Sequence, residues 1–324
     1  MFLQLNPGAL SPPAGGDLLH ARAVGDNDTL HFLFCSLGAP TLLILHTNTT
    51  LLEYDDANDT ADPTSDLFPE YRLQDFTWSR LHLSGPVALL CGSAPNTSDG
   101  WFCLKLSVFD SEGRGQQWPR LLHTANSTQL ELWLHGFSPR SAQSRFLVEL
   151  QSVGGAYPLN KVNVRRSIDD EFTPSIFQQM SEWVSSVNST PDVPWFVQWR
   201  PVAYRNSSRS LEDATACRSS APRPHSGNQT ASASALIQGF YSNPETFGLN
   251  VSFGAAGDPF FNSTRFTLLV GVGSPPVDSF SPLVVTIMAV GLGAPLLLLL
   301  VGGVWVCVRR TTSVSTASTY QPIN

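Results

Sequence analysis

Ten Asn-X-Ser/Thr triplets, in which X is never proline, are the residues of this 324-residue chain whose types and spacing most plainly specify a chemistry. In the secretory pathway such triplets accept N-linked oligosaccharides on the asparagine amide. The fifteen asparagines and the Ser and Thr content would give roughly three triplets by chance, so ten is an excess. The acceptors are Asn27, Asn48, Asn58, Asn96, Asn126, Asn188, Asn206, Asn228, Asn250 and Asn262.

Catalytic and metal-binding spacings are absent from the sequence: it holds no GxSxG, HExxH or CxxC motif and no phosphate-binding loop. The carboxylates of "SIDDEF" are adjacent, and adjacent residues on a strand point in opposite directions, so they predict a solvated turn rather than a glycosidase pair. The acidic run "YDDANDTADPTSD" lacks the EF-hand pattern, because Ala61 and Leu67 stand where Gly and Glu are required. The sequence therefore predicts no enzyme, cofactor or metal centre.

One disulfide follows from the spacing of the cysteines. Cys91 and Cys103 flank "GSAPNTSDGWF" between the apolar runs "PVALL" and "LKLSVF", which predicts a hairpin with a bridge across its mouth. Cys35 and Cys217 could pair by elimination, although four cysteines allow three pairings, and that choice stays open.

The acceptors need a scaffold on one side of a membrane, and the C-terminal part of the chain supplies the anchor. Leu283 to Val308 contain no charged residue and are long enough, as a helix, to cross a bilayer. Arg309 and Arg310 follow directly, which favours the cytosol for that end. We therefore expect a type I glycoprotein with its N-terminal part in the lumen.

The expected organisation has four parts. Residues 1–17 lack the basic and apolar regions of a signal peptide, so the chain is expected to be mature, truncated or preceded by further residues. Residues 18–280 form the glycosylated lumenal part, 281–308 the transmembrane helix and 309–324 the cytosolic tail. The net charge of −7 and the presence of only two lysines argue against nucleic-acid binding.

Short apolar or alternating runs separated by Gly, Pro, Asn and Ser predict a lumenal part built of strands. The fold class is mostly β: antiparallel β-sandwich-type packing in one or two lumenal units, followed by one transmembrane helix. Residues 205–235, rich in Ser, Ala and Pro, are expected to form an exposed loop that either divides two subdomains or interrupts one. Only "PSIFQQMSEWVSSV" predicts a helix. The runs expected as strands are "TLHFLFCSL", "TLLILHT", "TQLELWLHGF", "SRFLVELQSV", "WFVQWRPVAY", "LNVSF" and "RFTLLVGVG".

Several blocks, in order from about Leu18 to Asn324, resemble the glycosylated lysosomal membrane protein family. They are "LLHARAVGDNDTLHF", "RLLHTANSTQLEL", "SIDDEFTPSIFQ", "QWRPVAY" and "GVGSPPVDSFSPLVVTIMAVGLGAP", closed by "YQPIN". The resemblance implies a non-enzymatic lysosomal membrane protein that acts as accessory subunit of a lysosomal transporter of the major facilitator superfamily and protects it from lumenal proteolysis. It also implies a tyrosine-based sorting signal at Tyr320 and Ile323, read by clathrin adaptor complexes.

The resemblance has departures, and other readings stay open. Family members are expected to be longer around "HTNTTLLEYDD", and a family cysteine is replaced near Gly248, which leaves the partner of Cys217 open. A homodimer is a further expected partner state. The alternatives to the accessory role are a cell-surface adhesion or receptor glycoprotein and a membrane-anchored lumenal hydrolase.

The tail supplies a direct test. Replacing Tyr320 by Ala removes the ring expected to fill one adaptor pocket, and Ile323→Ala removes the apolar group expected to fill the second. We expect either change to move much of the protein to the cell surface, as measured by surface biotinylation. If the double variant still resides in lysosomes, the tail does not carry the sorting signal.

Overall fold

The computed structural model describes residues 2–7, 16–25, 29–36, 40–47, 66–67, 71–72, 76–93, 100–116, 119–137, 146–153, 162–169, 176–184, 194–205, 214–225, 236–237, 246–253, 263–277 and 282–314. The chain divides into two compact units. The first comprises Met1–Asp169 and Ser175–Val277, and the second Asp170–Pro174 and Asp278–Asn324.

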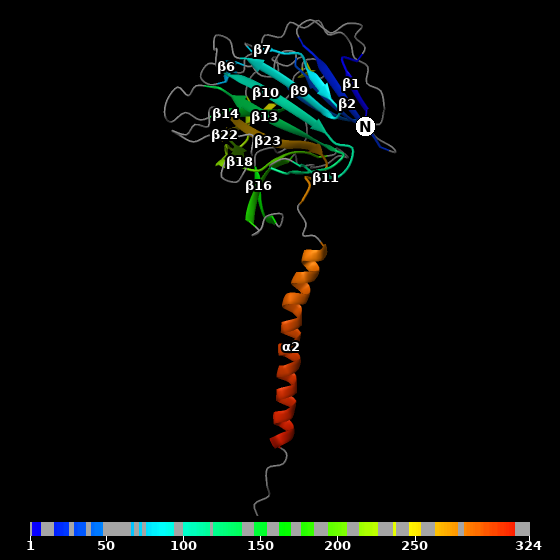
Figure 1. The fold of residues 1–324 in the computed structure, drawn as a ribbon, viewed down its shortest axis with the longest axis vertical. Helices are drawn as coiled ribbons and strands as arrows, with labels where there is room; N and C mark the ends of the chain where they lie inside the picture. The colour runs from blue at the N-terminus through cyan, green and yellow to red at the C-terminus, as the bar shows by residue number, and fades with distance from the viewer. Residues whose placement is uncertain are drawn as a thin grey trace, which may run out of the picture. The chain divides into compact units, whose positions relative to one another are not determined.

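Eleven strands form the largest sheet of the first unit (Figure 1). Their order is β15-β16-β17-β23-β13-β10-β9-β7, with β18 pairing β23 and β19, and β8 pairing β9, and every pairing is antiparallel. The strands are β7 (Thr77–Trp78), β8 (His82–Ser84), β9 (Val87–Ser93), β10 (Trp101–Val108), β13 (Ser127–His135), β15 (Asn163–Asp169), β16 (Ile176–Val184), β17 (Trp195–Trp199), β18 (Val202–Tyr204), β19 (Ala214–Ala216) and β23 (Ser263–Val272).

Two four-stranded sheets accompany it. One has the order β1-β2-β3-β4, and the other has β14-β22-β20 with β21 also pairing β22. Their strands are β1 (Phe2–Leu5), β2 (Leu18–Val24), β3 (Thr29–Cys35), β4 (Thr41–Thr47), β14 (Phe146–Val153), β20 (Arg218–Ser219), β21 (Arg223–His225) and β22 (Thr246–Phe253). Two small pairs complete the described strands: β5 (Asp66–Leu67) with β6 (Tyr71–Arg72), and β11 (Gly113–Arg114) with β12 (Leu122–His123).

The core lies between the large sheet and the two smaller ones. Register places Leu90 opposite Leu104 and Leu104 opposite Leu132, and Phe266 continues this row on β23. Full burial of such a side chain contributes about 1.5–3 kcal/mol. The same cluster includes side chains from both four-stranded sheets, so sheets pack face to face and the mostly β, sandwich-type prediction is confirmed. The members from the smaller sheets are Leu19, Phe34, Leu249, Val251 and Phe253.

Each of the seven sequence runs predicted to be a strand contains one, but the prediction of a helix was wrong. "PSIFQQMSEWVSSV" contains β16, which pairs with β15 on one side and with β17 on the other. Met180 and Glu182 share one face of this strand and Ser181 and Trp183 share the other, and all four are buried. Each face therefore carries a polar and an apolar residue, and the sequence shows no strand alternation. The spacing of its apolar residues matches a helical period by chance, but pairing with β15 and β17 makes this segment a strand.

The expected exposed loop at about 205–235 is also partly regular. It contains β19, β20 and β21, which pair with β18 or β22. Cys217 is buried within it and belongs to the main core. The small and polar residues of this segment therefore form short strands at sheet edges, where little side-chain burial is needed.

The second unit contains one long helix, α2, which runs from Pro282 to Val314 over 33 residues. Leu283–Thr311 is long and apolar enough to cross a membrane, judged by length and composition, and no other described helix meets that criterion. The helix continues through Arg309 and Arg310, so regular structure extends past the end expected for the span at Val308.

A buried carboxylate joins the first four-stranded sheet to the large one. The Asp17 carboxylate accepts hydrogen bonds from the Asn6 amide (3.0 Å), the Arg80 guanidinium (3.0 Å) and the Leu81 backbone N–H (2.8 Å). Burial alone would raise the pKa of Asp17, but the Asn6 and Leu81 hydrogen bonds and the Arg80 charge hold it below its ordinary 3.8. Asp17 therefore stays ionised in mildly acidic surroundings.

We expect Asp17→Asn to lower the free energy of unfolding by about 1–3 kcal/mol, because hydrogen bonds to a charged acceptor are lost. The folded pKa is depressed, so the contribution of Asp17 is present above pH 3.8 and disappears as the pH falls further. Urea denaturation of the purified full-length protein at pH 7, 5 and 3 measures both effects. The exposed Asp110→Asn is the matched control and should change stability by less than about 0.5 kcal/mol.

Candidate functional site

Two of the ten predicted glycan acceptors lie in the described part of the chain, and both are exposed. Asn126 belongs to the tight turn before β13, and its carbonyl accepts the Val272 N–H at 3.0 Å. Asn250 lies in the middle of β22 between Leu249 and Val251, which are fully buried. Because side chains alternate along a strand, burying these neighbours turns the Asn250 amide outward. Both positions can carry a glycan without disturbing the core.

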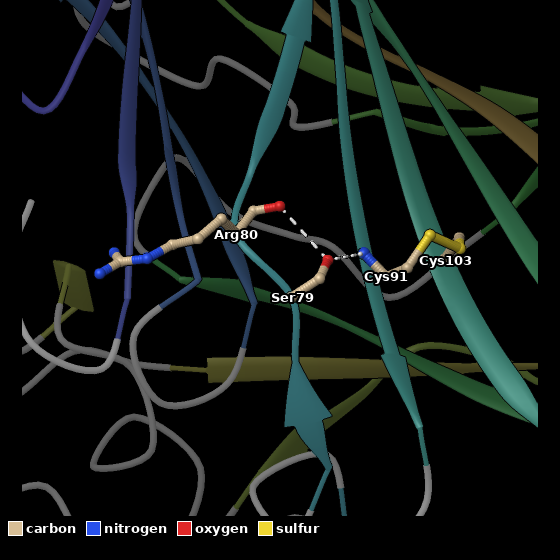
Figure 2. The surroundings of a disulfide bond; sticks show 4 residues. All are labelled: Ser79, Arg80, Cys91 and Cys103. Carbon is tan, nitrogen blue, oxygen red and sulfur yellow. Dashed lines mark hydrogen bonds between the residues drawn. A yellow bond between two sulfur atoms is a disulfide. The ribbon is translucent and has the colours of Figure 1, made fainter.

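The predicted disulfide is confirmed. Cys91 on β9 lies directly opposite Cys103 on β10, with a Cα–Cα distance of 4.1 Å. Figure 2 shows Ser79 beside the bridge: its hydroxyl accepts the Cys91 N–H at 3.2 Å and donates to the Arg80 carbonyl at 3.3 Å. Since the Arg80 guanidinium also reaches Asp17, the hairpin and the junction between the sheets are held by adjacent residues.

Cys35 and Cys217 are both buried, each 7 % exposed, at the end of β3 and directly after β19. Of the disulfides that the four cysteines allow, the structure contains the one between Cys91 and Cys103. Cys307 is exposed on α2.

A charged and aromatic cluster occupies the outer face of the large sheet, defined as the face opposite the Leu104–Leu132 row. The Glu131 carboxylate is only 2 % exposed and lies 3.6 Å from the Lys105 ammonium and 3.7 Å from the Arg265 guanidinium. Arg265 also stacks 4.0 Å above the Trp133 ring. The alternation of "TQLELWLH" had separated Glu131 and Trp133 from the core-facing leucines, but the partner cations come from other strands, which sequence spacing does not reveal.

The first unit, called the β-rich unit from here on, ends in residues that are hydrogen-bonded to the same sheet. The Pro276 carbonyl accepts hydrogen bonds from the Arg165 guanidinium (3.1 Å) and the Gln198 amide (3.2 Å). Arg165 also forms an ion pair with Glu182 at 2.9 Å. Burial raises the pKa of Glu182, and the charge of Arg165 offsets only part of that effect. The segment that precedes the apolar helix is thus held by side chains of β15 and β17.

A buried histidine pair lies in the first four-stranded sheet. His20 Nε2 and His31 Nδ1 are 2.9 Å apart and the rings stack. Burial, followed by the proximity of His31 and Arg22, lowers the pKa of His20 to about 4. Within the described ranges no three His, Cys, Asp or Glu side chains come together as a metal site would require.

On α2, the two arginines predicted to mark the cytosolic end follow the apolar stretch. The Arg309 guanidinium lies 4.3 Å from the centre of the Trp305 ring. The glycines at 291, 293, 302 and 303 leave open space beside the helix, since an added Cβ would meet no other atom within 4 Å. The contact between Arg309 and Trp305 is typical of an anchor at the membrane interface. The four glycines leave a shallow helix face that another helix could approach.

Other predicted site residues fall outside the described part of the chain. They are Tyr320 and Ile323 of the tail, the acidic residues 55–62, Asp170 and Glu171, and the acceptors Asn27, Asn48, Asn58, Asn96, Asn188, Asn206, Asn228 and Asn262.

Comparison with known proteins decides the family. A family model described as glycosylated lysosomal membrane protein matches residues 17–51 and 49–313. The chain belongs to the glycosylated lysosomal membrane protein family. A protein of that name from Danio rerio is 45 % identical, with 99 % of this chain and 91 % of that protein covered, and one from Mus musculus is 34 % identical, with 96 % and 88 % covered. The two matched stretches meet inside the segment where the family resemblance implies longer relatives.

These relatives are named as membrane glycoproteins and not as enzymes. Among solved structures, the heparan sulfate lyase HepC from Pedobacter heparinus aligns with a TM-score of 0.40 and 8 % identity, covering 82 % of this chain and 36 % of that one. A likeness of that size supports no inference about activity.

Glycan occupancy at the two described acceptors can be measured directly. We expect Asn126→Gln and Asn250→Gln each to remove one N-glycan and to increase gel mobility by about 2–3 kDa, while complete enzymatic deglycosylation removes tens of kilodaltons. The control is Asn163→Gln: this asparagine is exposed and belongs to no triplet, so its replacement should leave gel mobility unchanged. Asn6 would be unsuitable as a control because its side chain donates a hydrogen bond to Asp17. Unchanged mobility of both acceptor variants would contradict a glycosylated surface at these positions.

Proposed function

We propose that this chain is a non-enzymatic accessory subunit of a lysosomal transporter of the major facilitator superfamily. In this proposal it binds the transporter in the lysosomal membrane and protects the transporter's lumenal loops from proteolysis. The single observation that carries the proposal is membership of the glycosylated lysosomal membrane protein family along nearly the whole chain. The accessory role itself comes from the family resemblance.

The proposed topology is type I. All ten acceptors precede α2, and Arg309 and Arg310 lie at its far end. Glycans are added in the lumen and clustered arginines favour the cytosol, so both signals predict the same orientation. The tail residues Tyr320 and Ile323 would then face the clathrin adaptor complexes that sort proteins to lysosomes.

The proposed mechanism is steric. A protease must bind an extended and accessible stretch of backbone, and strands paired on both sides offer none. The β-rich unit presents paired strands in three large sheets, and its described acceptors lie on two of them: Asn126 beside β13 and Asn250 on β22. Glycans at these positions would extend the covered surface beyond the protein atoms. Such a unit can cover a partner's loops while resisting cleavage itself.

The accessory role has a specific cellular signature. Loss of this chain should lower the partner transporter's protein level without lowering its mRNA, because exposed loops are cleaved after synthesis. Lysosomal protease inhibitors should restore the protein, as measured by immunoblot and transcript quantification. A chimaera with the β-rich unit on an unrelated membrane helix should rescue in part, since coverage comes from the lumenal side.

Two results would contradict the proposal. One is a normal transporter level in cells lacking this chain, and the other is a loss that lysosomal protease inhibitors do not reverse. As a matched control, the tail variant Tyr320→Ala keeps the β-rich unit intact and tests whether co-residence in the lysosome is needed.

A further inference from the structure

Thr128, the second residue of β13, carries a hydroxyl that makes no bond within the fold. The residue is 0 % exposed, and within the described part of the chain its Oγ1 has no hydrogen-bond partner. Register places Thr128 between Val108 on β10 and Val270 on β23, and alternation turns it to the core with Leu132. Burying an unpaired hydroxyl is unfavourable, whereas valine would fill the same place and is equally suited to a strand. The presence of threonine here needs another explanation.

The triplet formed by Asn126, Ser127 and Thr128 supplies that explanation. Transfer of an N-linked oligosaccharide requires a hydroxyl in the third position of the triplet, and Thr128 provides it. In the folded protein Asn126 is exposed, whereas Ser127 and Thr128 are each 0 % exposed. The site can therefore display a glycan once it is attached, but the hydroxyl needed for attachment is out of reach.

The backbone of the triplet is closed as well. The Asn126 carbonyl accepts the Val272 N–H at 3.0 Å, and it packs so closely on Gly271 that a Cβ there would lie 2.7 Å from the carbonyl oxygen. The Ser127 hydroxyl accepts the Thr124 N–H at 2.9 Å and donates to the Thr124 carbonyl at 2.9 Å, which closes the turn. An enzyme that binds the triplet as an accessible stretch of chain would first have to separate β13 from β23.

The second described triplet, made of Asn250, Val251 and Ser252, differs in this respect. Ser252 is half-buried, and its hydroxyl donates to the Arg218 carbonyl at 3.5 Å. That hydroxyl has a partner in the fold, whereas the hydroxyl of Thr128 has none among the described residues.

We infer that Asn126 is glycosylated before β13 pairs with β23, and that Thr128 keeps its hydroxyl for this reaction although the hydroxyl destabilises the folded state. In the reaction, Asn126 Nδ2 forms a bond to the anomeric carbon of an oligosaccharide carried on a polyprenyl diphosphate. The bond from that carbon to the diphosphate oxygen breaks, the polyprenyl diphosphate leaves, and the amide nitrogen loses one proton to the surroundings. The inference rests on the lumenal topology proposed above.

The order of the strands along the chain leaves time for this step. Ser263, the first residue of β23, follows Thr128 by 135 residues (263 − 128). At a synthesis rate of roughly 5–20 residues per second, β23 begins to emerge about 7–27 s after Thr128. Until then the edge of β13 that will pair with β23 is open and the triplet can be bound. Pairing then closes it.

Stability measurements test the claim about the hydroxyl. In an Asn126→Gln background, in which neither protein carries this glycan, Thr128→Val should raise the thermal midpoint of the full-length protein by about 2–4 °C, because an unpaired buried hydroxyl is removed. Ser252→Ala in an Asn250→Gln background is the matched comparison, and there the midpoint should not rise, because that hydroxyl has a partner. A midpoint that does not rise for Thr128→Val would overturn the inference.

Glycopeptide analysis tests the role of the hydroxyl in the transfer. In the otherwise unchanged protein, Thr128→Val should remove the glycan from Asn126 completely, whereas Thr128→Ser, which keeps a hydroxyl, should retain it. Thr267→Val replaces a buried threonine of β23 that belongs to no triplet, so it should leave occupancy at Asn126 unchanged. A glycan on Asn126 in the Thr128→Val protein would contradict the assigned role.

Pulse–chase labelling tests the order of events. Occupancy at Asn126, measured in molecules that have formed the disulfide between Cys91 and Cys103, should be the same after a long chase as at the end of the pulse. A rise during the chase would show that the folded triplet is still accepted, which overturns the inference. If Asn250 carries a glycan and Asn126 does not, the inference fails while the lumenal topology stands. If neither carries one, the topology fails and the inference fails with it.

Discussion

The antiparallel register of β9, β10, β13 and β23 is the constraint on which most other features of the β-rich unit depend. It aligns Leu90, Leu104, Leu132 and Phe266 in one buried row, and a slip of one residue would turn every side chain of a strand to the opposite face. The neighbouring row, one residue along, holds the disulfide, Trp133 and Arg265 on the outer face. The bridge between Cys91 and Cys103 fixes the β9–β10 register covalently, because a slip would separate its two ends.

Three buried ionisable groups respond to acid in different directions. The depressed pKa of His20 means that protons favour the unfolded chain as the pH falls from 6.5 to about 4, so stability declines in that window. Burial raises the pKa of Glu182 despite Arg165, so the folded state takes up a proton more readily than the unfolded chain and stability rises on acidification. Asp17 keeps its contribution down to pH 3.8. The opposing signs limit the net change in stability across a mildly acidic range.

The sequence predicts features that depend on local pattern and misses those that depend on pairing. Alternation and turn residues located the strands, and the spacing of Cys91 and Cys103 predicted their bridge, because both signals are local. Each face of β16 carries both polar and apolar residues, so the sequence shows no alternation there and its apolar spacing resembles that of a helix. The partners of Glu131 come from β10 and β23, and His31 meets His20 across a hairpin, so these contacts required the register that only the three-dimensional fold provides.

Low charge and many strand edges pose a solubility problem that the proposed glycans would answer. Only 14 % of the residues are charged, whereas β1 and β15 end sheets and could template pairing with other chains. Arg165 and Arg166 place charge on β15, which discourages such pairing, but Phe2 and Leu5 on β1 are exposed and apolar. In the proposed lumenal location, flexible charged loops would be open to cleavage by proteases. Glycans on ordered turns and strands, such as those of Asn126 and Asn250, would instead keep the surface soluble while the backbone beneath them stays paired.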